Sequence, residues 1–226
     1  MSEARDQIFG DIRARLGRGR LDDAANAAAA ERVRAHRRNL IPARAASLDH
    51  AGQIALFMSE AQAVDATIAR VARAADVPGA VADFLSGQNL PARLVMTPDP
   101  KLEAIPWDTR PMLELRRGVA DDGDAAGITG AFAAIAETGT LMLISGAATP
   151  TRNNFLPDTH IVVLRASEVV ACYEDGWDRL RAAGAMPRTV NFITGPSRTG
   201  DIEQRLVLGA HGPRRLHIVL IDDAGG

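Results

Sequence analysis

Apolar positions near the start of the chain follow a helical period but are few. Ile8, Ile12 and Leu16 share one helical face, and the following segment consists of good helix formers. Residues 1–44 carry ten arginines and six acidic residues, a net charge of +4 against −6 for the remainder. Residues 1–50 are therefore predicted to form a basic, helical N-terminal arm that is too poor in large apolar residues to form a core alone.

The strongest helical pattern comes directly after this arm. Core-compatible residues keep helical spacing over residues 53–75, which predicts one long helix of about six turns. Asp76 is placed to cap a second, shorter helix, and Gly87 is placed to end it. Both helices are expected to pack an apolar face on a core.

Short runs of strand-forming residues dominate the rest of the chain. Several are apolar throughout, as is typical of strands covered on both faces. The runs are residues 93–96, 112–115, 131–136, 140–144, 161–164, 191–194 and 216–221. Helices are expected at 167–183, with Ser167 as the cap, and at 201–208. This alternation predicts an α/β domain over residues 51–226 with a mainly parallel sheet.

Composition and charge exclude several classes of protein. A formal net charge of −2 over 226 residues lacks the basic surplus of a general nucleic-acid binder. Cys172 is the only cysteine, so this chain alone can build neither a thiolate-held zinc site nor an iron–sulfur cluster, and no HExxH motif is present. The chain also lacks an apolar run of about 18 residues and a signal-peptide core, so we expect a cytoplasmic protein without a membrane span.

The first candidate for chemistry is a carboxylate between two apolar runs that are expected to form either a tight hairpin or one bulged strand. Glu137 precedes Gly139, and glycine permits positive φ and close approach of a ligand to the backbone. Glu137 is therefore a candidate catalytic residue, and Thr138, Gly139 and Thr140 are candidate ligand-binding residues. The alternative is an ordinary β-turn with an exposed glutamate.

The second candidate is the segment that follows the predicted strand at residues 191–194. The chain turns there at Gly195 and enters the helix predicted from residue 201. Backbone N–H groups, a positive helix end, two hydroxyls and a guanidinium would meet in this turn, from Ser197, Arg198 and Thr199. Such a turn favours an anion. A helix cap formed by one of the two hydroxyls is a compatible alternative.

The third candidate is His211, which lies between two glycines ahead of the last strand. An imidazole there could donate, accept or exchange a proton near pH 6.5, so His211 is a second candidate catalytic residue. The alternative is a loop histidine held by structural partners. His217 is expected to be structural, and the role of His160 at the start of a strand stays open.

Three segments carry a family resemblance: AETGTLMLISG at 136–146, RNNFLP at 152–157 ahead of HIVVL, and ITGPSRTGDIEQRLVLGAHGPRRLHIVLID at 193–222. Together they resemble the LUD-domain family, and within it the lactate utilisation protein C group. The resemblance implies a three-layer α/β/α, Rossmann-like fold related to the NagB/RpiA/CoA-transferase-like superfamily. It also implies a role in a bacterial system that oxidises L-lactate to pyruvate, with iron–sulfur clusters expected only in partner subunits and no cofactor in this chain.

The predicted function is that of a cluster-free subunit of this lactate-oxidising system. An anionic ligand or substrate is expected to bind where the Glu137 turn, the loop at residues 195–199 and the His211 loop converge. Two alternatives remain. One is a stand-alone enzyme of transferase or ligase type that uses Glu137 as nucleophile or base, since Glu-x-Gly is the form in which CoA-transferase-like enzymes present a glutamate. The other is a scaffold subunit without catalysis.

Overall fold

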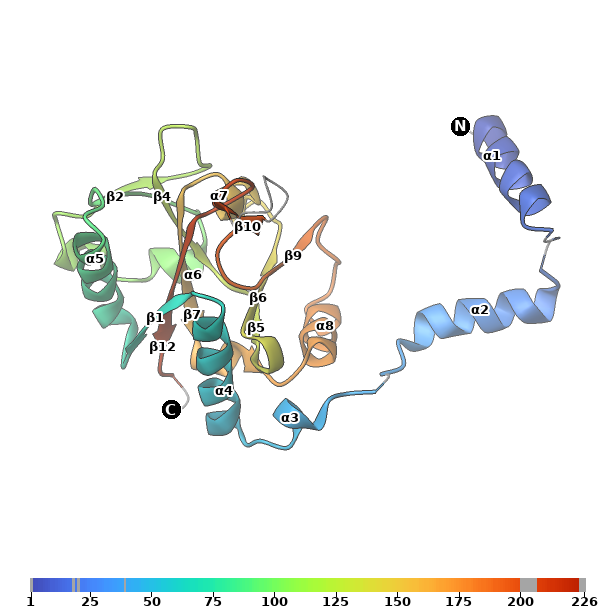
Figure 1. Cartoon of the computed structure of the whole chain (residues 1–226), viewed down its shortest axis with the longest axis horizontal. Coiled ribbons are helices and arrows are strands. Elements are labelled where there is room, and N and C mark those ends of the chain that lie inside the picture. Colours follow the sequence, from blue (N-terminus) through green and yellow to red (C-terminus); the bar gives the residue numbers. More distant parts are fainter. Residues whose placement is uncertain (1, 18, 20, 39, 200–206, 224–226) are drawn as a thin grey trace. The chain divides into compact units, whose positions relative to one another are not determined.

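Figure 1 shows the computed structural model of the chain, which describes residues 2–17, 19, 21–38, 40–199 and 207–223. Contacts within the chain divide it into two units, Met1–Leu40 and Ile41–Gly226. Helices make up the regular structure of the first unit, and the second unit contains all the described strands.

The first unit contains two helices, α1 (Ser2–Arg15) and α2 (Asp23–Ala35), where the sequence predicts them. Asp22 caps α2, because its side chain accepts a hydrogen bond from the Ala25 N–H at 2.7 Å. The large apolar side chains of α1 are exposed, and α2 has no buried residue among those described. Each helix therefore lacks a packed apolar face within this unit.

A sheet of six parallel strands lies at the centre of the second unit. Its strand order is β1-β12-β7-β4-β2-β3, and every neighbouring pair runs parallel. The strands are β1 (Thr67–Val71), β2 (Arg93–Met96), β3 (Glu114–Arg117), β4 (Ala126–Gly130), β7 (Thr159–Arg165) and β12 (Arg215–Ile221). The mainly parallel sheet predicted from the sequence is confirmed.

A smaller sheet has the strand order β8-β5-β6-β9. It consists of β5 (Ala133–Ile135), β6 (Thr140–Ile144), β8 (Val169–Val170) and β9 (Val190–Ile193). The turn η3 (Ala136–Thr138) joins β5 to β6 as the predicted antiparallel hairpin. Two further strands, β10 (Arg198–Thr199) and β11 (Val207–Leu208), pair only with each other.

Helices and turns connect these strands. They are α3 (Ala43–Ala46), α4 (His50–Ala63), η1 (Ala74–Asp76), α5 (Val77–Gly87), α6 (Pro100–Glu103), η2 (Trp107–Thr109), α7 (Arg152–Phe155), η4 (Ala166–Glu168) and α8 (Tyr173–Ala182). Among the helices that the structure describes, none is long and apolar enough to cross a membrane.

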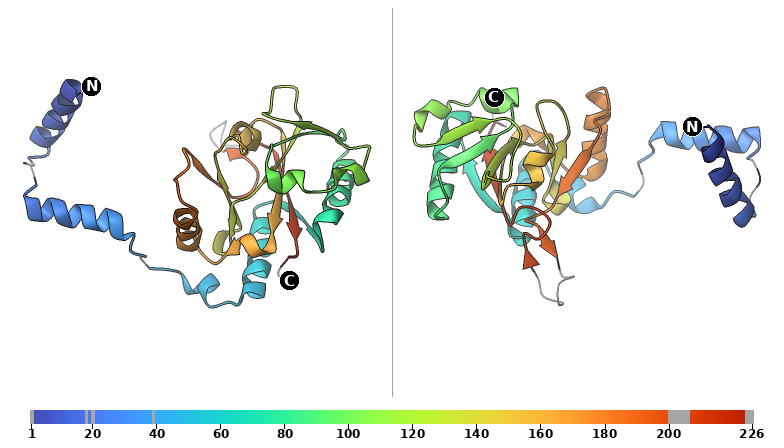
Figure 2. Two further views of the ribbon diagram at one scale, coloured as in Figure 1. Left: turned by 180° about the vertical axis from the view of Figure 1, so that it is seen from behind. Right: turned by 90° about the horizontal axis from the view of Figure 1, so that it is seen from above.

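The alternation of side chains along β12 builds a core on each face of the central sheet. Ile218 and Leu220 pack with Phe57 of α4, whereas Val219 packs with Leu85 of α5. Figures 1 and 2 show α5 on one face of the sheet, and α4 together with the smaller sheet on the other. Helix α8 packs on the far side of the smaller sheet. The predicted three-layer α/β fold is therefore confirmed.

The long helix predicted over residues 53–75 is wrong in its second half. Helix α4 ends at Ala63, and Thr67–Val71 forms β1 at the edge of the central sheet. Asp65 takes a left-handed φ of 65° between the two elements, which ends the helical path. The apolar residues Ile68 and Val71 satisfy a helical period, but pairing with β12 decides their conformation.

The helix predicted over residues 167–183 begins later than expected. Ser167 lies in the turn η4, Val169–Val170 pairs with β5 as strand β8, and α8 starts only at Tyr173. Two consecutive β-branched valines favour this edge pairing over a helix. Cys172 therefore caps α8 instead of lying in its middle, and Asp76, the predicted cap of α5, makes no capping side-chain bond.

The helix predicted over residues 201–208 lies mostly outside the described residues. Its last two positions, Val207–Leu208, form strand β11 instead, antiparallel to β10. The prediction is therefore wrong at the two positions that the structure describes. The sequence also missed strand β4, where Gly127 leaves so little room that a Cβ would lie 2.9 Å from Pro157 Cγ.

Candidate functional site

Two adjoining cavities open between the central sheet and the smaller sheet. The first, of about 260 Å³, is lined by side chains of α7, β7 and β9 and by the loops at residues 194–198 and 211–213. The second, of about 160 Å³, lies where β2 and β4 end and is closed by the end of β6. Asn154 lines both cavities. The two cavities therefore share one wall residue.

The lining of the first cavity is rich in hydrogen-bond donors. It includes Ser197, Arg198, His211, His160 and Asn154. Of the described residues that line it, none is an aspartate or glutamate. Because every one of these side chains can donate a hydrogen bond, the cavity offers a surrounding suited to an acceptor-rich group such as a carboxylate or phosphate.

His160 is the most deeply buried polar residue of this lining, at 1% exposure. Its Nε2 lies 2.8 Å from Thr129 Oγ1, and its Nδ1 has no hydrogen-bond partner among the described residues. Burial lowers the pKa of His160 to about 3, so the ring is neutral near pH 7. In the tautomer whose Nε2 accepts from Thr129, the Nδ1–H is a buried donor that no described residue uses.

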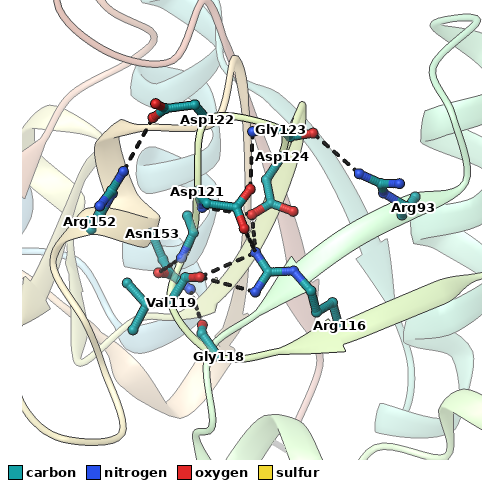
Figure 3. Close-up of polar contacts among 11 residues, drawn as sticks. Arg93, Arg116, Gly118, Val119, Asp121, Asp122, Gly123, Asp124, Arg152 and Asn153 are labelled. Carbon is teal, nitrogen blue, oxygen red and sulfur yellow. Dashed lines mark hydrogen bonds and ion pairs between the residues drawn. The ribbon is translucent and has the colours of Figure 1, made fainter.

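Two consecutive asparagines of α7 have opposite roles. Asn153 is fully buried, and its carboxamide donates to the Gly118 carbonyl at 2.9 Å and accepts from the Ala120 N–H at 2.8 Å (Figure 3). Asn154 is 5% exposed, and its side chain makes no hydrogen bond to any described residue. Asn153 thus ties helix α7 to the loop at residues 118–120. The carboxamide of Asn154, by contrast, is available to a ligand in the cavities.

A third buried amide belongs to the same region. Asn191 of β9 lies opposite Leu143 of β6 in the register, and its Nδ2 lacks a partner within the described chain. Leu143 lines the second cavity, and Ile193, two positions after Asn191, lines the first. Strand alternation places Asn191 on the face that these residues share. Asn191 itself lines neither cavity, so its unpaired amide lies beside the site and is not part of its lining.

The loop after β9 brings several residues predicted from the sequence into the first cavity. Gly195 has a φ of 75°, and a Cβ there would lie 2.4 Å from the Val64 carbonyl oxygen, so only glycine fits. The Arg198 guanidinium donates to that same carbonyl at 2.8 Å and pairs with Asp65. The charge of Arg198 is thus balanced by a carboxylate, where the sequence alone left it unpaired. Thr199 is buried and does not line the cavity.

The Glu137 turn lies outside the lining of both cavities. A Glu137 carboxylate oxygen accepts from the Tyr173 N–H at 3.3 Å, at the start of α8. Gly139 has a φ of 62°, and a Cβ there would lie 2.2 Å from the Ala61 nitrogen of α4. The structure therefore packs this turn between α8 and α4, and it does not place Glu137 with Ser197 and His211.

Hydroxyl groups nevertheless connect the turn to the first cavity. Thr138 Oγ1 lies 2.7 Å from Thr140 Oγ1, which lies 2.7 Å from Thr194 Oγ1. Both threonines of the turn also contact the Tyr173 hydroxyl at 3.1 Å. Thr194 lines the first cavity, so this chain of hydroxyls positions the end of β9 relative to the turn.

The remaining candidate groups are His211, the single cysteine and possible metal ligands. His211 is exposed and lines the first cavity. Burial raises the pKa of the Cys172 thiol to about 11, which leaves it protonated and unreactive near neutral pH. Within the described part of the chain, no group of three or more His, Cys, Asp or Glu residues could hold a metal ion.

The sequence missed Asn154 as a site residue and left His160 open. One available signal was the pattern of β7, where His160 shares a face with the core residue Val162 two positions later and so must point between the sheets. The tandem asparagines carried a second signal, because two adjacent buried amides ahead of an apolar strand require partners. Which of the two is satisfied within the chain depends on tertiary contacts.

Comparisons with known proteins agree with the fold and the sequence motifs. The LUD domain model matches residues 124–221. Lactate utilization protein C of Deinococcus radiodurans is 36% identical over 155 residues, which cover 66% of this chain and 70% of that protein. Lactate utilization protein C of Geobacillus sp. (strain WCH70) is 36% identical over 103 residues, 43% of this chain and 42% of that protein.

A solved structure adds independent support. The crystal structure of a DUF162 family protein from Deinococcus radiodurans superimposes with a TM-score of 0.58 and 28% sequence identity, covering 77% of this chain and 99% of that one. The family model and the relatives agree with the sequence motifs and the fold. The chain belongs to the LUD domain family.

Proposed function

We propose that this chain is a subunit of a system that oxidises L-lactate to pyruvate and that it binds an anionic ligand or substrate in the first cavity. The names of its relatives support a role in lactate utilisation. The Geobacillus match spans less than half of each chain, so activity and partners are argued from the site and the chemistry.

The observation that carries the anion site is the lining of the first cavity. Its described members supply donors from Ser197, His211, His160 and Asn154, and include no carboxylate. Hydrogen bonds from neutral donors to an ionised group contribute about 1.5–3 kcal/mol each, so several of them can hold an anion without an uncompensated cation. The Asp65 carboxylate balances Arg198, so the binding rests on the hydrogen-bond donors of the other lining side chains.

In this proposal the partner subunits accept the electrons and this chain binds the anion, because of the chemistry that side chains can supply. Removing a hydride or electrons from lactate requires an acceptor, and protein side chains do not supply one without a cofactor. The sequence holds one cysteine, which cannot complete a four-ligand cluster site. We therefore place the iron–sulfur clusters in partner subunits, with this chain binding or positioning the anion.

Reconstitution tests this proposal directly. The purified chain alone is expected to be colourless and to show no lactate-dependent dye reduction, whereas mixing it with the iron–sulfur subunits restores reduction. His211→Asn and Ser197→Ala are each expected to lower the reconstituted rate, while Ser86→Ala, an exposed serine on α5, leaves it unchanged.

Growth supplies the second readout. A deletion strain lacking this chain is expected to grow poorly on L-lactate as sole carbon source and normally on pyruvate. Normal growth on lactate, in a strain with no other lactate dehydrogenase, would contradict the pathway. Lactate-dependent dye reduction by the purified chain alone would contradict the assignment of electron acceptors to partners.

A further inference from the structure

The second cavity lies at a switch point of the central sheet. After β2 the chain passes to one face, where Leu102 and Trp107 pack with α5, and after β4 it passes to the other face, where Ala131 packs with α4. In open α/β sheets, ligands bind in the crevice at the carboxyl ends of the two strands where the connections diverge in this way. Thr97 follows β2 and Gly130 ends β4, and both line the second cavity.

The chemistry of the second cavity differs from that of the first. Its lining includes Thr97, Thr129, Thr149 and Asp99. The Thr97 hydroxyl donates to the Ile128 carbonyl and the Thr129 hydroxyl pairs with His160, but each hydroxyl oxygen can still accept a hydrogen bond, and Asp99 uses one carboxylate oxygen to accept from the Lys101 N–H. Lys101 also lines it, but its ammonium is paired with Glu168 at 2.5 Å. A carboxylate with no unpaired cation beside it repels an anion and accepts hydrogen bonds from hydroxyl groups. The second cavity therefore suits an uncharged, hydroxylated group.

Two features are common to the walls of the cavities. Asn154 lines both, and its carboxamide carries donors and an acceptor that no described residue uses. Thr129 lines the second cavity and lies 2.8 Å from the His160 ring that lines the first. A carboxamide in this position can donate to an anion on one side and accept from a hydroxyl on the other. The shared wall is thus built of groups that suit both halves of one ligand.

The sizes of the cavities indicate a ligand larger than lactate. Lactate has six non-hydrogen atoms and fills roughly 100 Å³, the space of three to four water molecules. The first cavity alone measures about 260 Å³, and the second adds about 160 Å³. Both together fall within the range of roughly 300–1,000 Å³ that is typical of small-molecule sites, whereas lactate would leave most of that space empty.

We propose that the two cavities form one bipartite site for a hydroxylated organic anion longer than three carbons, whose charged group lies in the first cavity and whose hydroxylated tail lies in the second. This inference rests on the anion site of the proposed function and assigns a second half to it. Asn154 is then a specificity-determining residue, because it contacts the ligand where its charged and uncharged parts meet.

The test compares two acids of equal charge by NMR titration of the full chain: L-lactate with three carbons, and gluconate with six carbons and a hydroxylated tail. Gluconate is expected to bind the wild-type chain at least about tenfold more tightly. Thr149→Phe, which fills the second cavity from its loop, is expected to lower gluconate affinity to that of lactate and to leave lactate unchanged. Thr109→Phe, outside both cavities, should alter neither affinity.

Thr97→Val provides a second variant that conserves shape and removes one hydroxyl of the second cavity. It is expected to weaken gluconate several-fold without affecting lactate. Equal affinities of the two acids for the wild-type chain, or unchanged gluconate affinity in both folded variants, would overturn the bipartite site while leaving the anion site intact. Binding of neither acid would overturn the anion site of the proposed function as well.

Discussion

Helix α7 contacts both the loop at residues 118–124 and the wall of the two cavities, but buried polar groups are paired in the loop and unpaired in the wall. In the loop, Asn153 satisfies two backbone groups, and Asp124 accepts from Arg116 and from the Asp121 N–H (Figure 3). In the cavity wall, the Nδ1 of His160 has no partner among the residues described, and the carboxamide of Asn154 makes no hydrogen bond to any of them. The loop is complete as folded, whereas the wall requires a ligand or water to complete it.

Helix α7 shows this difference in two neighbouring residues: Asn153 is paired within the chain and serves stability, whereas Asn154 lines the cavities and serves binding. A buried polar group that is paired within the chain stabilises the fold, and its loss leaves its partner unsatisfied. A buried polar group that is unpaired lowers stability and is retained where it serves binding. The comparison therefore predicts which substitutions act on unfolding and which act on ligands.

The largest expected effect is acid destabilisation through two buried histidines, of which His160 lines the first cavity and His217 lies outside both cavities. Burial lowers the pKa of His160 to about 3 and that of His217 to about 4, from an ordinary value of 6.5. The unfolded chain therefore binds more protons below pH 6.5, so stability is complete above that pH and falls as pH decreases. Each histidine is expected to remove up to roughly 1.4 kcal/mol per pH unit, or about 2 kcal/mol from pH 6.5 to 4.5.

Denaturant unfolding at a series of pH values measures this slope. His160→Gln should reduce the slope by about half between pH 6 and 4.5. The loop supplies the control. Burial alone would raise the pKa of Asp124, but the Asp121 N–H and the Arg116 guanidinium outweigh it and hold this pKa below its usual range. Asp124→Asn should therefore change the pH dependence of stability only below about pH 4. An equal slope in the wild type and in His160→Gln would show that His160 does not cause the acid destabilisation.

The next effect is on the loop itself. Asn153→Ala removes the partners of the Gly118 carbonyl and the Ala120 N–H and is expected to lower the free energy of unfolding by roughly 2–3 kcal/mol. Asn154→Ala, one residue later, loses no hydrogen bond within the described chain and should cost less than about 1 kcal/mol. Equal losses in the two variants, measured by urea denaturation, would remove the distinction between loop and wall.

A smaller effect concerns ligand affinity at the wall. Ser197→Ala removes one neutral donor from the first cavity and is expected to weaken L-lactate binding about tenfold, or roughly 1.4 kcal/mol, with unchanged stability. Isothermal titration calorimetry measures the affinity, and Ser86→Ala on α5 serves as the control. An unchanged affinity in Ser197→Ala would place the anion elsewhere.

The smallest effect is expected from the first unit. Deleting residues 1–40 should leave the Tm of the remaining chain within about 2 °C, because the second unit carries its own cores on both faces of the sheet. Scanning calorimetry of the truncated and full chains makes the measurement. A fall of more than about 5 °C would show that the N-terminal helices belong to that core.

The sequence predicted the parts of the fold in which local pattern and tertiary context agree. The apolar runs of β7 and β12 and the hairpin β5–β6 have one stable arrangement, because strands covered on both faces must be apolar throughout. It failed at β1, where Ile68 and Val71 satisfy helical and strand periods alike and only pairing with β12 decides. It failed again at β4, whose glycines weaken any strand pattern.

The candidate site was predictable in part for a related reason. Gly195, Ser197, Arg198 and His211 are close together because their loops follow β9 and precede β12, which the sequence pattern indicates. The pairing of Arg198 with Asp65 crosses more than a hundred residues and left no local signal. Thr138, Gly139 and Thr140, predicted from the sequence as ligand-binding residues, lie outside both cavities at a turn that packs against α4, a contact that only the tertiary structure shows.

The central claim is that an anion occupies the first cavity, whose lining includes His160. Histidine side-chain ¹⁵N NMR of the full chain, recorded at pH 7 with and without saturating L-lactate, tests it most directly. The account predicts that lactate moves the Nδ1 resonance of His160 and fixes its Nδ1–H tautomer, while His217, equally neutral but outside both cavities, keeps its spectrum. An unchanged His160 in a chain whose other resonances report lactate binding would contradict it.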